Sequence, residues 1–112
     1  MAGIFLSVYT LLVVLAIFFL VPPAEGLGNL VRIAFFHIPV AWVSVLACCM
    51  SAWWAAAYLR PQSMRADELS ARSARLGFGF VLLAVISGAW FAKLTWGAWW
   101  NWDPRQTTIF VL

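Results

Sequence analysis

Charged residues are scarce in this sequence: Asp, Glu, Lys and Arg make up 10% of its 112 residues, whereas 65% are hydrophobic. Together with a mean hydropathy of +0.94, this composition excludes a water-soluble domain and indicates a protein of the lipid bilayer. The combination of basic and aromatic residues that is typical of nucleic-acid binding is also missing. We therefore expect membrane lipid, and no nucleic acid, around this chain.

Cysteine and histidine are scarce as well. Cys48 and Cys49 are adjacent within an apolar run, a spacing that fits neither a metal site nor a disulfide framework. Because no C-x-x-C-H sequence is present, the chain does not carry haem in the way that a c-type cytochrome does. His37 is the only histidine. A membrane redox subunit with b-type haem would need paired histidines within its helices, so we regard that class as less favoured.

Long apolar runs predict the fold. At about 1.5 Å per residue, three of them can cross most or all of a hydrocarbon core of about 30 Å. We expect an all-α, polytopic transmembrane protein with three full helices and the start of a fourth, in a single transmembrane domain at 1–112. The predicted helices span residues 4–21, 31–59, 76–93 and 104–112. Because the last run stops after roughly one turn, we expect either a chain truncated from a larger fold or a fold completed from elsewhere.

Local signals predict two helix ends. The Pro22-Pro23 pair should end the first helix, because proline supplies no backbone donor. Further on, Asp103 is expected to be an N-cap, with Pro104 at the first helical position and Gln106 completing a capping box.

Small side chains predict where two helices touch. Gly88 with Ala84 or Ala92 provides a small-x-x-x-small face that is suited to close helix packing. Cys48 follows His37 by about three turns on roughly the same helix face. We expect its side chain to pack against a neighbouring helix.

The distribution of arginine predicts the orientation in the membrane. The segment 60–75 holds four arginines against two acids, so by the positive-inside rule it should be a cytoplasmic loop. Within it, 67–75 fits a short surface helix and a solvated loop equally well. The turn at 24–32 and the tryptophan-rich segment at 96–105 should then lie together on the outer side.

Four of the eight tryptophans fall within seven residues of this outer segment. One interpretation is a belt of interfacial anchors, as in a small structural membrane subunit. The other is a flat platform for a large planar ligand, with cationic side chains at its edge to pair with carboxylates. The residues concerned are Trp96, Gly97, Trp99, Trp100 and Trp102, followed by Asp103 and flanked by Lys93 and Arg105.

His37 is predicted to lie in the second helix, near the same outer face. Its ordinary role would be an interfacial histidine that hydrogen-bonds a backbone carbonyl. The alternative role is a ligand to haem iron, because neutral imidazole suits iron and ionisable groups within a bilayer are usually functional.

Two segments resemble a known family. Trp96–Arg105, W-G-A-W-W-N-W-D-P-R, resembles the WWD signature of the cytochrome c assembly membrane proteins. Phe36–Ser44, F-H-I-P-V-A-W-V-S, preceded by N-L-V-R, is similar to the H-V-P-A-A-W segment of that family's CcmC-type haem exporter. The resemblance covers nearly the whole chain.

The resemblance implies a six-helix protein of the inner membrane without catalytic turnover. It would bind haem b transiently at the outer face, among other cytochrome c maturation subunits, and deliver it to a periplasmic haem chaperone. His37 would be an axial iron ligand, and the platform would comprise Trp96, Gly97, Trp99, Trp100, Trp102 and Asp103. The family's second axial histidine belongs to a later loop, and the D-P pair after Trp102 is common in haem-lyase relatives, which remain an alternative.

Overall fold

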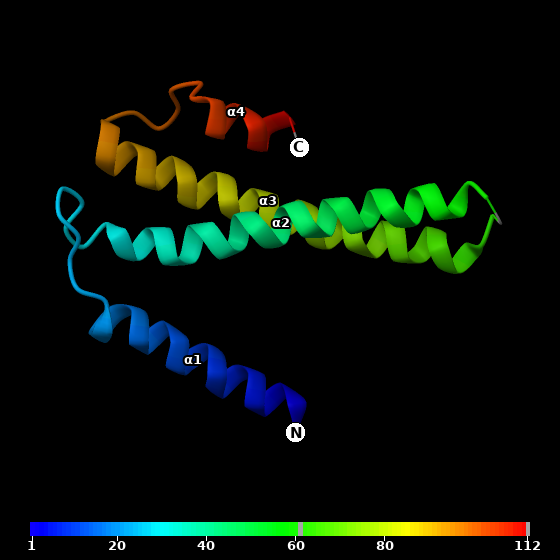
Figure 1. Cartoon of the computed structure of the whole chain (residues 1–112), viewed down its shortest axis with the longest axis horizontal. Helices are drawn as coiled ribbons and strands as arrows, with labels where there is room; N and C mark the ends of the chain where they lie inside the picture. Colours follow the sequence, from blue (N-terminus) through cyan, green and yellow to red (C-terminus); the bar gives the residue numbers. More distant parts are fainter. Residues whose placement is uncertain (61, 112) are drawn as a thin grey trace.

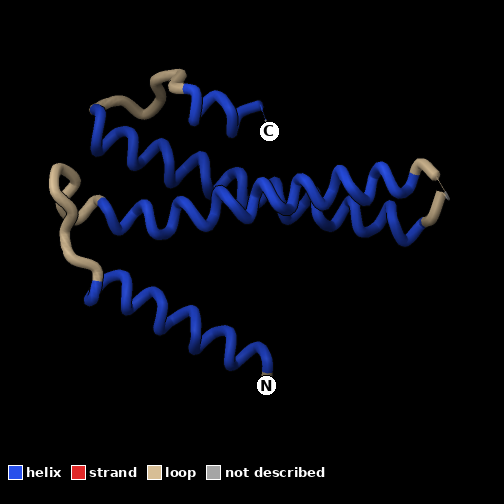
Figure 2. Tube along the Cα trace, in the orientation of Figure 1, coloured by secondary structure: helices blue, strands red, loops and turns tan. Residues whose placement is uncertain are grey.

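The computed structural model describes residues 1–60 and 62–111, and within these the regular structure is entirely helical (Figures 1 and 2). The helices are α1 (Ala2–Leu20), α2 (Val31–Tyr58), α3 (Met64–Trp96) and α4 (Pro104–Val111). The first three are long and apolar enough to cross a membrane. The predicted all-α polytopic fold is therefore confirmed.

An antiparallel pair, α2 and α3, forms the centre of the molecule (Figure 1). Helix α1 diverges from this pair, and α4 turns back alongside the C-terminal half of α3. The molecule measures 54 × 42 × 16 Å. In the view down the shortest axis, α2 crosses in front of α3, whereas α1 and α4 lie beside the pair (Figure 1). Most large apolar side chains are exposed, as expected of helices surrounded by lipid.

Small residues allow α2 and α3 to approach closely. Ala84 and Ala92 are 2% and 1% exposed, which confirms the predicted small face of α3. A Cβ built on Gly77 would lie 3.0 Å from the sulfur of Cys48, so Cys48 packs against this glycine as predicted. Near the other end of the pair, the hydroxyl of Ser70 donates to the Ser51 carbonyl at 3.0 Å. Close packing and this polar contact stabilise the pair without a hydrophobic force between lipid-exposed helices.

Helix α3 is much longer than predicted. It has 33 residues and begins at Met64, whereas the apolar run indicated 76–93. The polar segment expected as a loop at 60–75 therefore forms mainly the first turns of α3, apart from residue 61, which lies outside the described residues. Ala66 is buried there, and Glu68 pairs with Arg72 at 3.3 Å. The apolar run marks the span suited to the membrane, while small residues and an i,i+4 ion pair extend the helix beyond it.

The other helix bounds agree closely with the sequence. Helix α1 ends before Val21, whose extended backbone (φ −79°, ψ 116°) is the conformation favoured ahead of Pro22. The predicted bounds of the second helix, 31–59, differ from those of α2 by one residue. Leu112, the last residue of the predicted fourth helix, lies outside the described residues.

The two ends of the central helix pair differ in chemistry. The segment 21–30 and the tryptophan-rich segment lie at one end, and the turn between α2 and α3 lies at the other (Figure 1). At the first end, the Arg32 guanidinium donates to the Val21 carbonyl at 3.4 Å and ties the end of α1 to the start of α2. The predicted grouping of the first turn with the tryptophans is therefore confirmed; which side faces outward remains a prediction.

Candidate functional site

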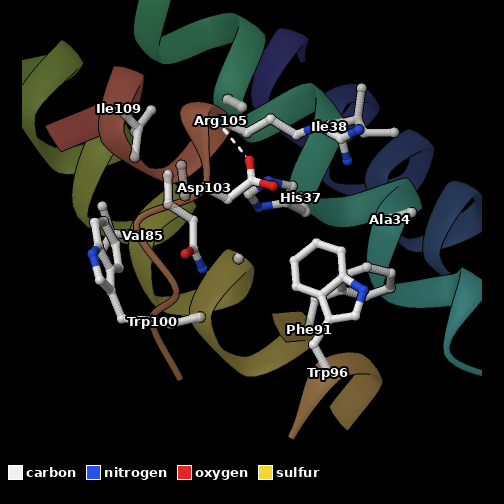
Figure 3. Close-up of a pocket in the computed structure, with 15 residues that line it drawn as sticks. Ala34, His37, Ile38, Val85, Phe91, Trp96, Trp100, Asp103, Arg105 and Ile109 are labelled. Carbon is white, nitrogen blue, oxygen red and sulfur yellow. Dashed lines mark hydrogen bonds between the residues drawn. The ribbon is translucent and has the colours of Figure 1, made fainter. Parts of the chain in front are cut away.

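A cavity of about 410 Å³ lies at the tryptophan-bearing end, between α2, α3 and α4 (Figure 3). This volume falls within the roughly 300–1,000 Å³ typical of small-molecule sites. Its walls are mostly apolar, with a few polar groups from His37, Asp103, Arg105 and Gln106. In the view of Figure 3, the indoles of Trp96 and Trp100 lie on opposite sides, with His37 and Asp103 between them.

His37 enters the cavity from α2 and is held by α3. Its Nδ1 lies 2.9 Å from the Ser87 hydroxyl oxygen. The ring also lies over Gly88, where an added Cβ would come within 2.9 Å of Cε1. Nε2 makes no hydrogen bond within residues 1–60 and 62–111, and it is not among the buried unpaired atoms there, so it is accessible. The imidazole therefore has one nitrogen anchored to α3 and one accessible for a ligand.

The end of α3 places Trp96 against the cavity. Trp96 is the last helical residue, and its ring meets Phe91 edge to face at 6.4 Å. Gly97 follows with φ +79°, a left-handed conformation that suits glycine and ends the helix. The Lys93 ammonium donates to the Gly97 carbonyl at 2.8 Å. Lys93 and Gly97, both predicted as haem contacts, lie outside the cavity and shape this helix end.

The four tryptophans do not form one flat platform. Trp100 lines the cavity, and Trp102 meets it edge to face at a centroid distance of 5.6 Å and an angle of 86°. Phe110 of α4 packs against both rings, at 6.2 Å in each case. Trp99 and Trp102 are 57% and 67% exposed and do not line the cavity. Trp102 thus supports Trp100, while the exposed Trp99 fits an interfacial anchor.

Asp103 directly precedes α4 and caps it, as the sequence predicted. Its carboxylate accepts a hydrogen bond from the Arg105 backbone N–H at 2.8 Å (Figure 3). The capping box is altered, because the Gln106 side chain accepts from the N–H of Asn101 and not from that of Asp103. Trp102 causes this difference: its left-handed backbone, φ +54°, curls the chain so that Asn101 faces the first turn of the helix.

Arg105 is the cationic side chain of the cavity wall. The one ion pair within residues 1–60 and 62–111 joins Arg72 to Glu68, so the Arg105 guanidinium is free to meet an anion. Trp100 Nε1 is buried and has no acceptor among the described residues. An unsatisfied buried N–H is costly, and this one is not accessible to a ligand in the cavity.

The cavity collects five of the nine predicted site residues. These are His37, Trp96, Trp100, Asp103 and Arg105. Gly88 was predicted only as part of the small face of α3, and Ser87 was not predicted as a site residue, so the contacts of both with His37 were missed. A hydroxyl within an apolar run was the available signal for Ser87. Phe91, Gln106 and Ile109 also line the cavity without having been predicted, because nothing in their spacing distinguishes them from ordinary packing residues.

Comparison with protein families matches residues 1–112 to the family described as CcmC, heme exporter protein C. Among curated proteins, heme exporter protein C of Rhodobacter capsulatus is 32% identical over 99 residues, covering 85% of this chain and 39% of that protein. A putative cytochrome c biosynthesis ccmC-like mitochondrial protein of Marchantia polymorpha is 31% identical over 85 residues, or 76% of this chain and 37% of that protein.

A shorter stretch is similar to another group. Cytochrome c biogenesis protein CcsA of Prochlorococcus marinus is 49% identical over 45 residues, or 40% of this chain and 15% of that protein. The chain thus spans about two-fifths or less of the length of these curated relatives. No solved structure matches the chain significantly.

Proposed function

The chain belongs to the heme exporter protein C family, and from this membership we propose that it binds haem in the cavity at its tryptophan-bearing end. The observation that carries the proposal is the meeting of His37 from α2 with Trp96, Trp100 and Arg105 in one cavity wall. His37 precedes the other three residues by 59 to 68 positions in the sequence. A belt of membrane anchors would not require a histidine and a free cation to converge with the indoles.

Each of these groups has a role that suits haem. The accessible Nε2 of His37 would be an axial ligand to the iron. The indoles of Trp96 and Trp100 offer apolar surface to the porphyrin ring. The Arg105 guanidinium is a donor suited to the propionate oxygens. Asp103 holds the turn that brings Arg105 and the tryptophans together.

Transfer, and not turnover, is the proposed activity. His37 is the only histidine of the 112 residues, so they supply a single imidazole ligand to haem b. The family membership supports a part in cytochrome c maturation, in which the protein would pass haem to a periplasmic chaperone beside other membrane subunits. The similarity to a CcsA protein fits this process but covers much less of the chain.

Charge supports the orientation of this site. Arg60, Arg65, Arg72 and Arg75 lie near the end of the molecule opposite the cavity, at the close of α2 and along the first turns of α3. Under the positive-inside rule, that end faces the cytoplasm and the cavity faces outward from the inner membrane. Haem would then be presented on the side where it is consumed.

Titration of the detergent-purified chain with hemin and with iron-free protoporphyrin tests the proposal. A site with a histidine ligand should bind hemin saturably, at one per chain, and bind the iron-free ring more weakly. Membrane anchors without a site would take up both compounds alike and without saturation. That second result would return the tryptophans to a structural role and end the haem proposal.

A further inference from the structure

Ser87 makes three polar contacts, and the two shorter ones together determine the form of His37. The serine oxygen lies 2.8 Å from the Leu83 carbonyl oxygen, 2.9 Å from His37 Nδ1 and 3.3 Å from the Ala84 carbonyl oxygen. The two shorter separations are close to the most frequent hydrogen-bond lengths. A serine hydroxyl, however, has a single hydrogen to donate.

Only one arrangement gives both short contacts a hydrogen. A carbonyl oxygen has no hydrogen, so the Ser87 hydroxyl must donate to Leu83, as serines within helices commonly do. The contact with His37 then requires Nδ1 to carry a hydrogen and the serine oxygen to accept it. In the opposite arrangement, with Ser87 donating to Nδ1, two acceptors would face each other at 2.8 Å. The neutral imidazole therefore carries its lone pair on Nε2.

Gly88 fixes the position of the same ring. A Cβ at this residue would lie 2.9 Å from Cε1 and 3.6 Å from Nε2 of His37, so the imidazole occupies the space that a side chain would fill. Two consecutive residues of α3 thus restrain one ring of α2: Gly88 limits where the ring sits, and Ser87 selects which nitrogen is protonated.

We propose that Ser87 is a positioning residue that holds His37 in the Nδ1-protonated tautomer and presents Nε2 to the haem iron. This inference rests on the proposed haem binding at the same cavity. An N–H···O bond at the far nitrogen fixes the ring and raises the basicity of a ligating histidine, and losing such a partner typically weakens metal binding about 10–100-fold.

The tautomer can be measured without haem. Because His37 is the only histidine, nitrogen-15 labelling of histidine gives one pair of ring signals in the NMR spectrum of the purified chain. At a pH where the ring is neutral, the wild-type chain should show Nδ1–H and a bare Nε2. Ser87→Ala should shift the signals toward the Nε2–H tautomer, and Ser87→Thr, which keeps a hydroxyl, should retain the wild-type pattern.

Hemin binding then tests the consequence. Ser87→Ala should bind hemin about tenfold more weakly but iron-free protoporphyrin as well as the wild type does, whereas damage to the cavity would weaken both. Thr95→Ala is the matched control, since Thr95 makes the same bond to the carbonyl four residues back at 2.7 Å, without a histidine partner. It should change neither the tautomer nor the affinities.

The two proposals can fail separately. The positioning role alone is overturned if the chain binds hemin but the His37 tautomer does not change in Ser87→Ala. It is also overturned if the wild-type His37 carries its hydrogen on Nε2. A Ser87-dependent tautomer in a chain that shows no saturable hemin binding overturns the proposed function, and the positioning role falls with it.

Discussion

Among the residues predicted to contact haem, some line the cavity and others lie outside it. Eight of the nine predicted residues lie between 93 and 105, so their grouping rested on adjacency along the chain, whereas His37 was grouped with them by the predicted topology and the family resemblance. Lys93, Gly97, Trp99 and Trp102 lie outside the cavity, and the left-handed backbone at Gly97 and at Trp102 turns the chain between them. Adjacency in sequence could predict the segment, but only the turn geometry decides which of its side chains reach the cavity.

Neighbouring tryptophans provide a direct test of this distinction. Trp100 lines the cavity, whereas Trp99 is exposed beside it. Trp100→Leu should lower hemin affinity by about fivefold, since an aromatic contact contributes roughly 1 kcal/mol beyond its apolar area. Trp99→Leu, the matched control, should leave the affinity almost unchanged. Optical titration of both variants measures the difference; equal losses, or a loss confined to Trp99→Leu, would refute the assignment of Trp100 to the site.

At the level of helices, apolar length and proline predicted α1 and α2 to within about two residues. The start of α3 was not predictable in this way, because its first turns are polar and owe their helical form to Ala66, Ser70 and the Glu68–Arg72 pair. The close approach of Gly88 to His37 also escaped prediction, since a pattern within one helix does not reveal its register against another.

The packing of α2 on α3 can be tested with two glycines of one helix. A side chain at Gly77 would meet Cys48 at 3.0 Å, whereas Gly79 has nothing within 4 Å. Gly77→Leu should therefore lower the free energy of unfolding in detergent by about 1–3 kcal/mol, the usual effect of overpacking.

Gly79→Leu serves as the control and should not destabilise the chain, because its side chain would extend into lipid or detergent. Thermal unfolding followed by circular dichroism compares the two. If both variants unfold at the same temperature, the α2–α3 interface described for Gly77 is wrong.

The whole molecule is thin and has two chemically different ends. One end carries the cavity, and the other carries the arginines, so the membrane orientation decides on which side a ligand would bind. The shortest dimension is 16 Å, and large apolar side chains are exposed along α1. These faces are suited to lipid or to further transmembrane helices.

Cysteine labelling in intact spheroplasts tests the orientation. In a chain with Cys48 and Cys49 replaced by alanine, Met64→Cys marks the start of α3, and Asn101→Cys marks the tryptophan-rich segment. A membrane-impermeant thiol reagent should label Asn101→Cys and reach Met64→Cys only after lysis. Labelling of Met64→Cys in intact spheroplasts would reverse the orientation and place the cavity on the cytoplasmic side.

The central claim is that His37 ligates haem iron within the cavity, and chemical rescue tests it most directly. His37→Gly removes the imidazole but leaves Gly88 and Ser87, which contact the ring in the wild type. Added imidazole can then bind in the vacated space and ligate the iron. We predict that His37→Gly binds hemin more weakly with a shifted Soret band, and that imidazole restores the wild-type spectrum at concentrations that leave free hemin largely unligated. A His37→Gly chain whose hemin spectrum and affinity match the wild type without imidazole would contradict the account.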